Sequence, residues 1–271
     1  MLQKSTKVLN LVDVSRLHAG ESTEFTNYYS IPVPTRDEMK TILNGNANTS
    51  WYDVSDLDSL KPNVDGTGTI TLGAAVAYIA DQSGNNRHLT NSNAAQRPTL
   101  IQENNRYLLS FDGFDDVLYW NTFNVNQGTT YYMLLAMSRA VNSGAAFGYA
   151  SYKTSTRYMR MSGNSTGQRA NIAIRGTGGN FTSTATVDTF PLSTYGVIDG
   201  QATPTLIDVK TPTGNTFQTV ISGDTSNNAA KISLGGAPAS AALTPHKIGG
   251  MVGFSGALSS DNRDKVRLYF T

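Results

Sequence analysis

Carboxylate side chains decide which hydrolytic chemistry this chain could perform, and glutamate is confined to the first part of the sequence. The 271 residues include 20 aspartates and glutamates, but no glutamate follows Glu103. Glycoside hydrolysis normally uses two carboxyl groups roughly 5 to 9.5 Å apart. The nearest cluster to such a pair is D-V-S-D-L-D (53–58), which we interpret as a solvated turn. The sequence therefore predicts no catalytic residues. A glycan hydrolase or lyase is the least favoured of the three functions that we consider.

A second acidic cluster offers oxygen ligands rather than a catalytic pair. Asp112, Asp115 and Asp116 lie within S-F-D-G-F-D-D-V-L (110–118). Because Asp-Gly favours tight hairpins, we interpret Asp112-Gly113 as the turn between two strands. The alternative is a calcium site, since Ca²⁺ prefers several carboxylate and carbonyl oxygens. We expect no resident cofactor, and calcium at these three aspartates stays open.

Histidine and cysteine offer little catalytic potential in this sequence. Cysteine is absent, which excludes disulfides, thiolate nucleophiles and Cys-ligated metals. The three histidines are His18, His88 and His246, and none belongs to a recognisable catalytic motif. We interpret each as a turn or surface residue, although a dispersed Ser-His-Asp triad is compatible with any sequence spacing.

Aromatic side chains could instead provide the platform of a carbohydrate site. Trp51 and Trp120 are the candidates for glycan binding, because polar loops rich in Asn and Asp are plentiful around them. Aromatic residues of a β-sandwich usually belong to its core or to cross-strand pairs. Both interpretations stay open for the two tryptophans.

The overall charge and composition exclude several classes of protein. The formal net charge is +1, so the basic field of a nucleic-acid-binding or polybasic membrane-binding protein is missing. Charged residues make up only 15% of the chain, and Gly, Asn, Ser and Thr are abundant. This composition favours strands and turns over helices. The longest apolar run, Tyr131–Met137, is far shorter than a membrane span.

Short apolar runs separated by turn residues predict an all-β sandwich from about Trp51 onward. Tyr131–Met137 is apolar at successive positions, which predicts a central strand covered on both faces. A short C-terminal helix is expected to begin with Ser260 as its cap. The predicted strands are 76–80, 107–111, 117–120, 130–138, 145–151, 158–161, 170–174, 184–187, 195–198, 205–209, 232–234 and 247–254.

Residues 1–50 differ from the rest and are interpreted as an N-terminal arm. Thr35–Leu43 is a predicted helix, with Thr35 and Glu38 spaced as a capping box. A segment of this length cannot bury a core alone. The arm should therefore pack on the main domain or on a neighbouring subunit, and its removal is expected to leave a folded sandwich.

Three motifs and the C-terminal end together resemble a known family. WYDVSDLDSL (51–60), VAYIADQSGNNRHLTNSNAAQRPTL (76–100), YLLSFDGFDDVLYW (107–120) and IGGMVGFSGALSSDNRDKVRLYF (248–270) are similar to a concanavalin A-like, or laminin G-like, domain. Domains of this kind are widespread in phage virion proteins and bacterial surface proteins. The resemblance implies a jelly-roll β-sandwich over residues 51–271, with the arm before it.

The same resemblance implies a function. It favours a non-enzymatic phage virion protein, a capsid decoration or head spike protein that projects a lectin-like domain from the particle surface. The expected partners are the major capsid protein and further copies of the chain, with a trimer favoured, and a surface glycan; neither nucleic acid nor membrane is expected. The alternative is a glycan-binding adhesin of a phage tail or cell surface. Glucanases of this fold carry E-x-D-x-E or E-x-D-x-x-E on one strand, a string that this sequence lacks.

Overall fold

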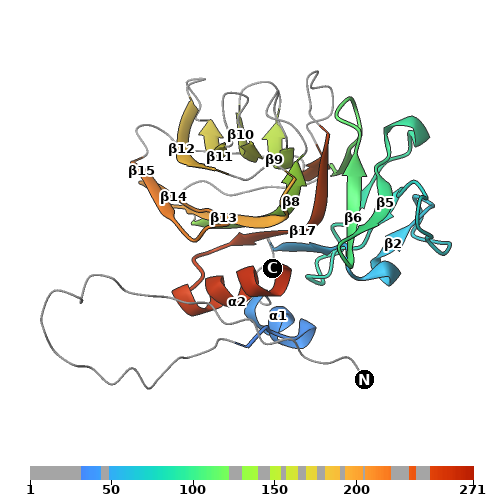
Figure 1. Ribbon diagram of the computed structural model, residues 1–271, viewed down its shortest axis with the longest axis horizontal. Helices are drawn as coiled ribbons and strands as arrows, with labels where there is room; N and C mark the ends of the chain where they lie inside the picture. Colours follow the sequence, from blue (N-terminus) through green and yellow to red (C-terminus); the bar gives the residue numbers. More distant parts are fainter. Residues whose placement is uncertain are drawn as a thin grey trace, which may run out of the picture.

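The computed structural model describes the chain as two stacked β-sheets with two helices on one side (Figure 1). Residues 1–31, which contain His18, lie outside the described residues. The described residues are 32–43, 49–121, 130–139, 147–153, 157–163, 169–175, 181–189, 193–203, 205–220, 232–235 and 245–271.

Sheet A is antiparallel and contains eight described strands. Its order is β15-β14-β13-β8-β17-β6-β5, and β1 pairs with β17 beside this path. The strands in this order are Thr216–Val220, Leu206–Lys210, Gly196–Ala202, Tyr131–Arg139, His246–Ser255, Arg106–Phe111 and Thr99–Glu103, with β1 at Ser50–Asp53.

Sheet B is also antiparallel and contains nine described strands in the order β12-β11-β10-β9-β16-β7-β4-β3-β2. The two sheets confirm the predicted all-β sandwich, and every predicted strand overlaps an observed one. The strands of sheet B in this order are Phe181–Thr189, Arg169–Arg175, Arg157–Gly163, Phe147–Lys153, Ile232–Gly235, Leu118–Trp120, Leu89–Thr90, Tyr78–Ile79 and Leu60–Lys61.

Strand β8 is central to the fold and is buried on both faces, as its apolar sequence predicts. Tyr131 and Met133 point into the core between the sheets, whereas Tyr132 and Leu134 point to the opposite side. This alternation follows from the two-residue period of a strand. Figure 1 shows helices α1 and α2 on that opposite side of sheet A, so the helices close a second core.

Helix α1 (Arg36–Leu43) forms where the capping box predicts it. The Thr35 backbone N–H donates to Glu38 Oε2 at 2.6 Å, and the Glu38 N–H donates to Thr35 Oγ1 at 3.3 Å. Met39 and Leu43 are fully buried in the second core together with Trp51. The helix of the arm therefore packs on its own domain, and removing it would uncover part of that core.

Helix α2 (Ser260–Phe270) closes the chain, and its cap is Ser259 rather than the predicted Ser260. Ser259 Oγ accepts a hydrogen bond from the Asn262 N–H at 3.3 Å. Val266 and Phe270 are buried against sheet A. Neither described helix has the length and apolar character needed to span a membrane.

An ionic cluster fastens α2 to sheet A. Asp199 on β13 is completely buried and accepts hydrogen bonds from Arg263 and Arg267 of α2. Arg263 also pairs with Asp208 at 2.6 Å, and the Arg267 guanidinium donates to the Lys210 carbonyl at 3.1 Å. The buried charges are therefore compensated, as burial of ions requires.

The predicted solvated turn at residues 53–58 is wrong for Asp53. This residue ends β1 and is 2% exposed. Its Oδ2 accepts a hydrogen bond from the Tyr269 hydroxyl at 2.6 Å and lies 3.3 Å from the Arg36 guanidinium. Both helices thus converge on one carboxylate of the sheet, which explains its burial.

Candidate functional site

The ends of three neighbouring strands of sheet A lie side by side, although they are far apart in the sequence. His246 begins β17 and lies in register with Phe111 at the end of β6 and Arg139 at the end of β8. One residue further along β17, Lys247 lies between Ser110 and Ser138. Directly paired residues of a sheet share a face, so these last three side chains form a row across three strands.

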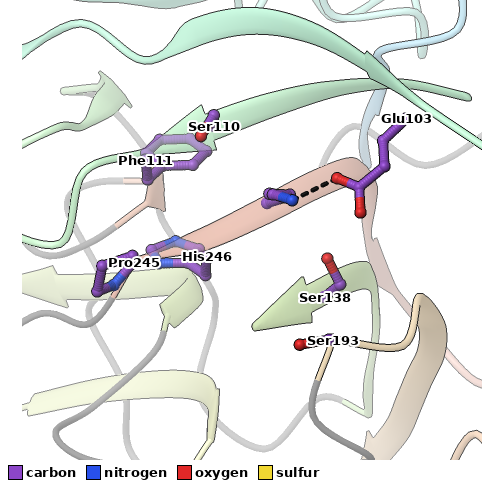
Figure 2. Close-up of a pocket in the computed structure, with 8 residues that line it drawn as sticks. Glu103, Ser110, Phe111, Ser138, Ser193, Pro245 and His246 are labelled. Carbon is purple, nitrogen blue, oxygen red and sulfur yellow. Dashed lines mark hydrogen bonds and ion pairs between the residues drawn. The ribbon is translucent and has the colours of Figure 1, made fainter. Parts of the chain in front are cut away.

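A pocket of about 140 Å³ opens beside the ends of these three strands. Figure 2 shows Phe111 and His246 on one side of it, Glu103 on another, and Ser138 and Ser193 below. Most of the lining residues are polar or charged, and Phe111 and Pro245 are apolar. The lining residues are Glu103, Ser110, Phe111, Ser138, Ser193, Pro245, His246 and Lys247.

The pocket contains one positive and one negative side chain, and the two are paired. Lys247 Nζ contacts Glu103 Oε2, and their side chains are 33% and 38% exposed. Phe111 and His246 stack face to face, with ring centres 4.9 Å apart and planes 3° apart. The pocket therefore combines hydroxyl groups and a compensated ion pair, and the two stacked rings beside it are buried.

The predicted surface position of His246 is wrong, because its side chain is buried against Phe111. His88 is partly buried and directly precedes β4, and its Nδ1 accepts a hydrogen bond from the Asp81 N–H at 3.1 Å. The ring of His88 also lies against Tyr78, with the ring centres 5.0 Å apart.

The acidic segment 112–117 directly follows the pocket residue Phe111. The predicted hairpin at Asp112-Gly113 is wrong, because β6 belongs to sheet A and β7 to sheet B. The segment is instead a connection between the two sheets. Gly235 at the end of β16 has a φ of +95°, and a Cβ there would collide with the Phe111 ring and lie 2.8 Å from the Asp116 carbonyl. Sheet B thus packs tightly against the base of this connection.

The connection brings together the three aspartates of the calcium alternative. One carboxylate oxygen from each of Asp112, Asp115 and Asp116 lies within 4.8 Å of the others. Ca²⁺ takes six to eight oxygen ligands, so backbone carbonyls or water would have to complete a site. The arrangement is compatible with a divalent cation and does not by itself require one.

Asp116 is the unusual member of this group because its side chain is buried. Burial raises the pKa of its carboxyl to about 6, and the nearby charges of Asp112 and Asp115 act in the same direction. The Asp112 backbone N–H donates to Asp116 Oδ2 at 2.9 Å, which partly opposes the rise. A carboxyl of raised pKa beside ionised ones is also a pattern of acid–base catalysis. Here all three come from one five-residue segment, and the described pocket is not lined by any of them.

Phe114 projects from the middle of this acidic connection. It is 78% exposed, more than any other large apolar side chain that the structure describes. Sequence reasoning did not select it, although its position between Asp-Gly and Asp-Asp is a signal of a loop tip. An exposed aromatic ring beside polar groups is the arrangement expected of a carbohydrate platform.

The two tryptophans do not provide such a platform. Trp51 is fully buried in the second core, with its ring edge-on to Tyr269 at 5.7 Å. Trp120 is half-buried and packs against the core between the sheets, on the same side of β7 as Leu118. The glycan-binding prediction for Trp51 is therefore wrong, and Trp120 presents only part of its ring.

Comparisons with known proteins identify the fold alone. No family model and no curated protein matches the sequence. Among solved structures, domain 4 of AbnA, a GH43 extracellular arabinanase from Geobacillus stearothermophilus in complex with arabinotriose, is similar at 11% identity and a TM-score of 0.58. The match covers 80% of this chain and 96% of that domain.

Two further structures show the same likeness over a smaller part of their own length. A Trypanosoma rangeli sialidase matches at 12% identity and a TM-score of 0.54, over 90% of this chain and 34% of the sialidase. The binding domain of Paraclostridial Mosquitocidal Protein 1 matches at 13% identity and a TM-score of 0.53, over 73% of this chain and 50% of that one. The shared feature is a β-rich fold found in glycosidases and in binding domains.

Proposed function

We propose that this chain is a glycan-binding module that holds its ligand without cleaving it. The observation that carries the proposal is the pocket between the ends of β6, β8 and β17, with Phe114 on the connection that follows it. Sugars present hydroxyl groups around a ring with apolar faces. The pocket offers serine hydroxyls and an ion pair to the hydroxyl groups, and the exposed ring of Phe114 suits an apolar face.

The likeness to solved structures supports this proposal at the level of the fold. The matching arabinanase domain is in complex with arabinotriose, and another match is the binding domain of a mosquitocidal protein. Fold alone does not assign a function, because one fold carries many different sites. The proposal therefore depends on the pocket, and the fold supplies its context.

The partners and positions of the carboxylates favour binding over hydrolysis. The Glu103 carboxylate is already engaged in an ion pair with Lys247. The three clustered aspartates belong to a single short connection, whereas glycosidase carboxyl groups flank the scissile bond. A hydrolase would show release of reducing sugar from a bound glycan, and we expect none.

The placement of this module on a phage particle is a further part of the proposal. It rests on the resemblance of residues 51–60, 76–100, 107–120 and 248–270 to concanavalin A-like domains of virion proteins. Because Met39 and Leu43 of α1 are buried in the second core, these two side chains are not available for contacts with a capsid protein. Mass spectrometry of purified particles, with sizing of the free chain for the expected trimer, tests this placement; absence from particles would refute it.

A glycan array probed with the purified full chain tests the binding function. We expect retention on a restricted set of oligosaccharides, and a clear loss of signal for Phe114→Ala. Val220→Ala is the matched control, because Val220 is 73% exposed on β15, the edge strand of sheet A at the opposite end of the order from β5. The proposal fails if the wild-type chain is retained by no glycan under conditions where it is folded.

A further inference from the structure

The ion pair of Lys247 and Glu103 sets the charge that a ligand would meet in the pocket. Lys247 is the second residue of β17 and Glu103 the last residue of β5, with β6 between the two strands. Figure 2 shows the Glu103 carboxylate linked across the pocket to an ammonium group. Their formal charges cancel, so the described pocket offers no unpaired cation from this row.

The neighbours of Lys247 strengthen this arrangement. Ser110 and Ser138 are its direct partners on the two adjacent strands, roughly 4.8 Å away on either side. Both serines line the pocket with it. Ser110, Lys247 and Ser138 therefore form a row of side chains in the pocket lining. The Glu103 carboxylate pairs with the lysine of this row.

This charge distribution discriminates between neutral and acidic sugars. A neutral sugar can donate a hydroxyl hydrogen to Glu103 and accept a hydrogen bond from Lys247 without separating the two. A sugar with a carboxylate must either displace Glu103 from Lys247 or approach Glu103 at close range, and like charges at that distance repel.

We propose that the pocket takes one neutral sugar residue, and that Glu103 is the specificity-determining residue that excludes acidic sugars such as uronates and sialic acids. This inference rests on the proposed glycan-binding function and adds to it the class of sugar. Lys247 is the group that an acidic sugar would use if Glu103 were removed. Its ammonium would then form a charge-assisted hydrogen bond to the sugar carboxylate, which is stronger than a neutral one.

The test measures binding of the full chain to matched neutral and acidic oligosaccharides on one array, including lactose with sialyllactose and galactan with polygalacturonate. We expect the wild type to retain neutral members only. Glu103→Gln should raise the ratio of acidic to neutral binding by about tenfold, which is close to the lower limit for a hydrogen bond to a charged group. Asp37→Asn is the control, because it removes one exposed carboxylate on α1, outside the pocket lining.

Lys247→Gln provides a second variant with the opposite expectation. It leaves Glu103 as the charged side chain of the pocket lining, so acidic sugars should stay excluded while neutral binding falls. Thermal unfolding of each variant shows whether it is folded. Equal acidic-to-neutral ratios in wild type and Glu103→Gln, or a wild type that prefers acidic sugars, would overturn the inference and leave the glycan-binding function standing. A wild type that binds neither class would overturn both.

Discussion

The buried carboxyl of Asp116 yields a quantitative prediction about the acidic connection. Its pKa is raised from an ordinary value near 4 to about 6, chiefly because burial disfavours the charged form. A shift of about two pKa units corresponds to about 3 kcal/mol, at 1.36 kcal/mol per unit. Asp116→Asn replaces the carboxyl by a neutral group of the same shape that can still accept from the Asp112 N–H.

The direction of the effect with pH follows from the position of the two pKa values. The folded-state pKa is higher than the unfolded-state one, so ionisation of Asp116 favours unfolding. This penalty is absent below about pH 4, develops between pH 4 and 6, and is complete above that range. Asp116→Asn should therefore match the wild type at pH 4 and exceed its free energy of unfolding by up to about 3 kcal/mol at pH 7.5.

Urea unfolding at several pH values in the presence of EDTA measures this difference. Asp37→Asn is the control, because that side chain is 93% exposed and its loss should change stability by no more than about 0.5 kcal/mol. A difference between wild type and Asp116→Asn that does not vary from pH 4 to 7.5, or a variant less stable throughout, would refute the reasoning.

The same pair of proteins tests the calcium alternative. A cation bound between Asp112, Asp115 and Asp116 would offset the penalty of the buried charge. Calcium at 100 times its dissociation constant would add about 2.7 kcal/mol to the stability of the wild type. Asp116→Asn should lose that gain. A wild type whose unfolding midpoint does not respond to calcium would exclude the site, with the pH prediction unaffected.

Three further changes test the site and the cores. Asp199→Asn should destabilise the fold by roughly 3–5 kcal/mol in urea unfolding, because two arginines of α2 lose their buried carboxylate; a cost below about 1 kcal/mol would contradict this. Phe114→Ala should abolish most glycan retention while leaving the unfolding temperature unchanged, and a parallel loss in Val220→Ala would show that the effect is not local. Met39→Ala should cost about 2–5 kcal/mol by thermal or urea unfolding, since this buried side chain joins α1 to sheet A; an unchanged stability would mean that α1 does not pack there.

The strands were predictable because their signal is local. Alternation of apolar and polar residues, bounded by Gly and Asn, depends only on neighbours in the sequence. The doubly buried strand β8 was predictable for the same reason, since its apolar residues are continuous. Strands β1, β2, β4, β5 and β15 were not predicted. Of these, β2 and β4 have only two paired residues each, which carry no measurable period.

The errors concern residues whose environment depends on distant segments. Asp112-Gly113 is compatible with a hairpin, and only the pairing of β7 with β4 and β16 shows that the chain changes sheet. Trp51 and Phe114 are both large aromatic residues in polar surroundings of the sequence. Helices from both ends of the chain bury Trp51, whereas the second sheet leaves Phe114 outside.

By itself the sequence determined the all-β class, the two capped helices and the lack of a glucanase carboxylate string, because composition and local periodicity carry that information. Only the tertiary structure decided the site. Glu103 and Lys247 are 144 positions apart, and they meet because antiparallel pairing places β5, β6 and β17 side by side. Which side chains meet across a sheet follows from strand order and register, and both are set by contacts between segments that no local pattern records.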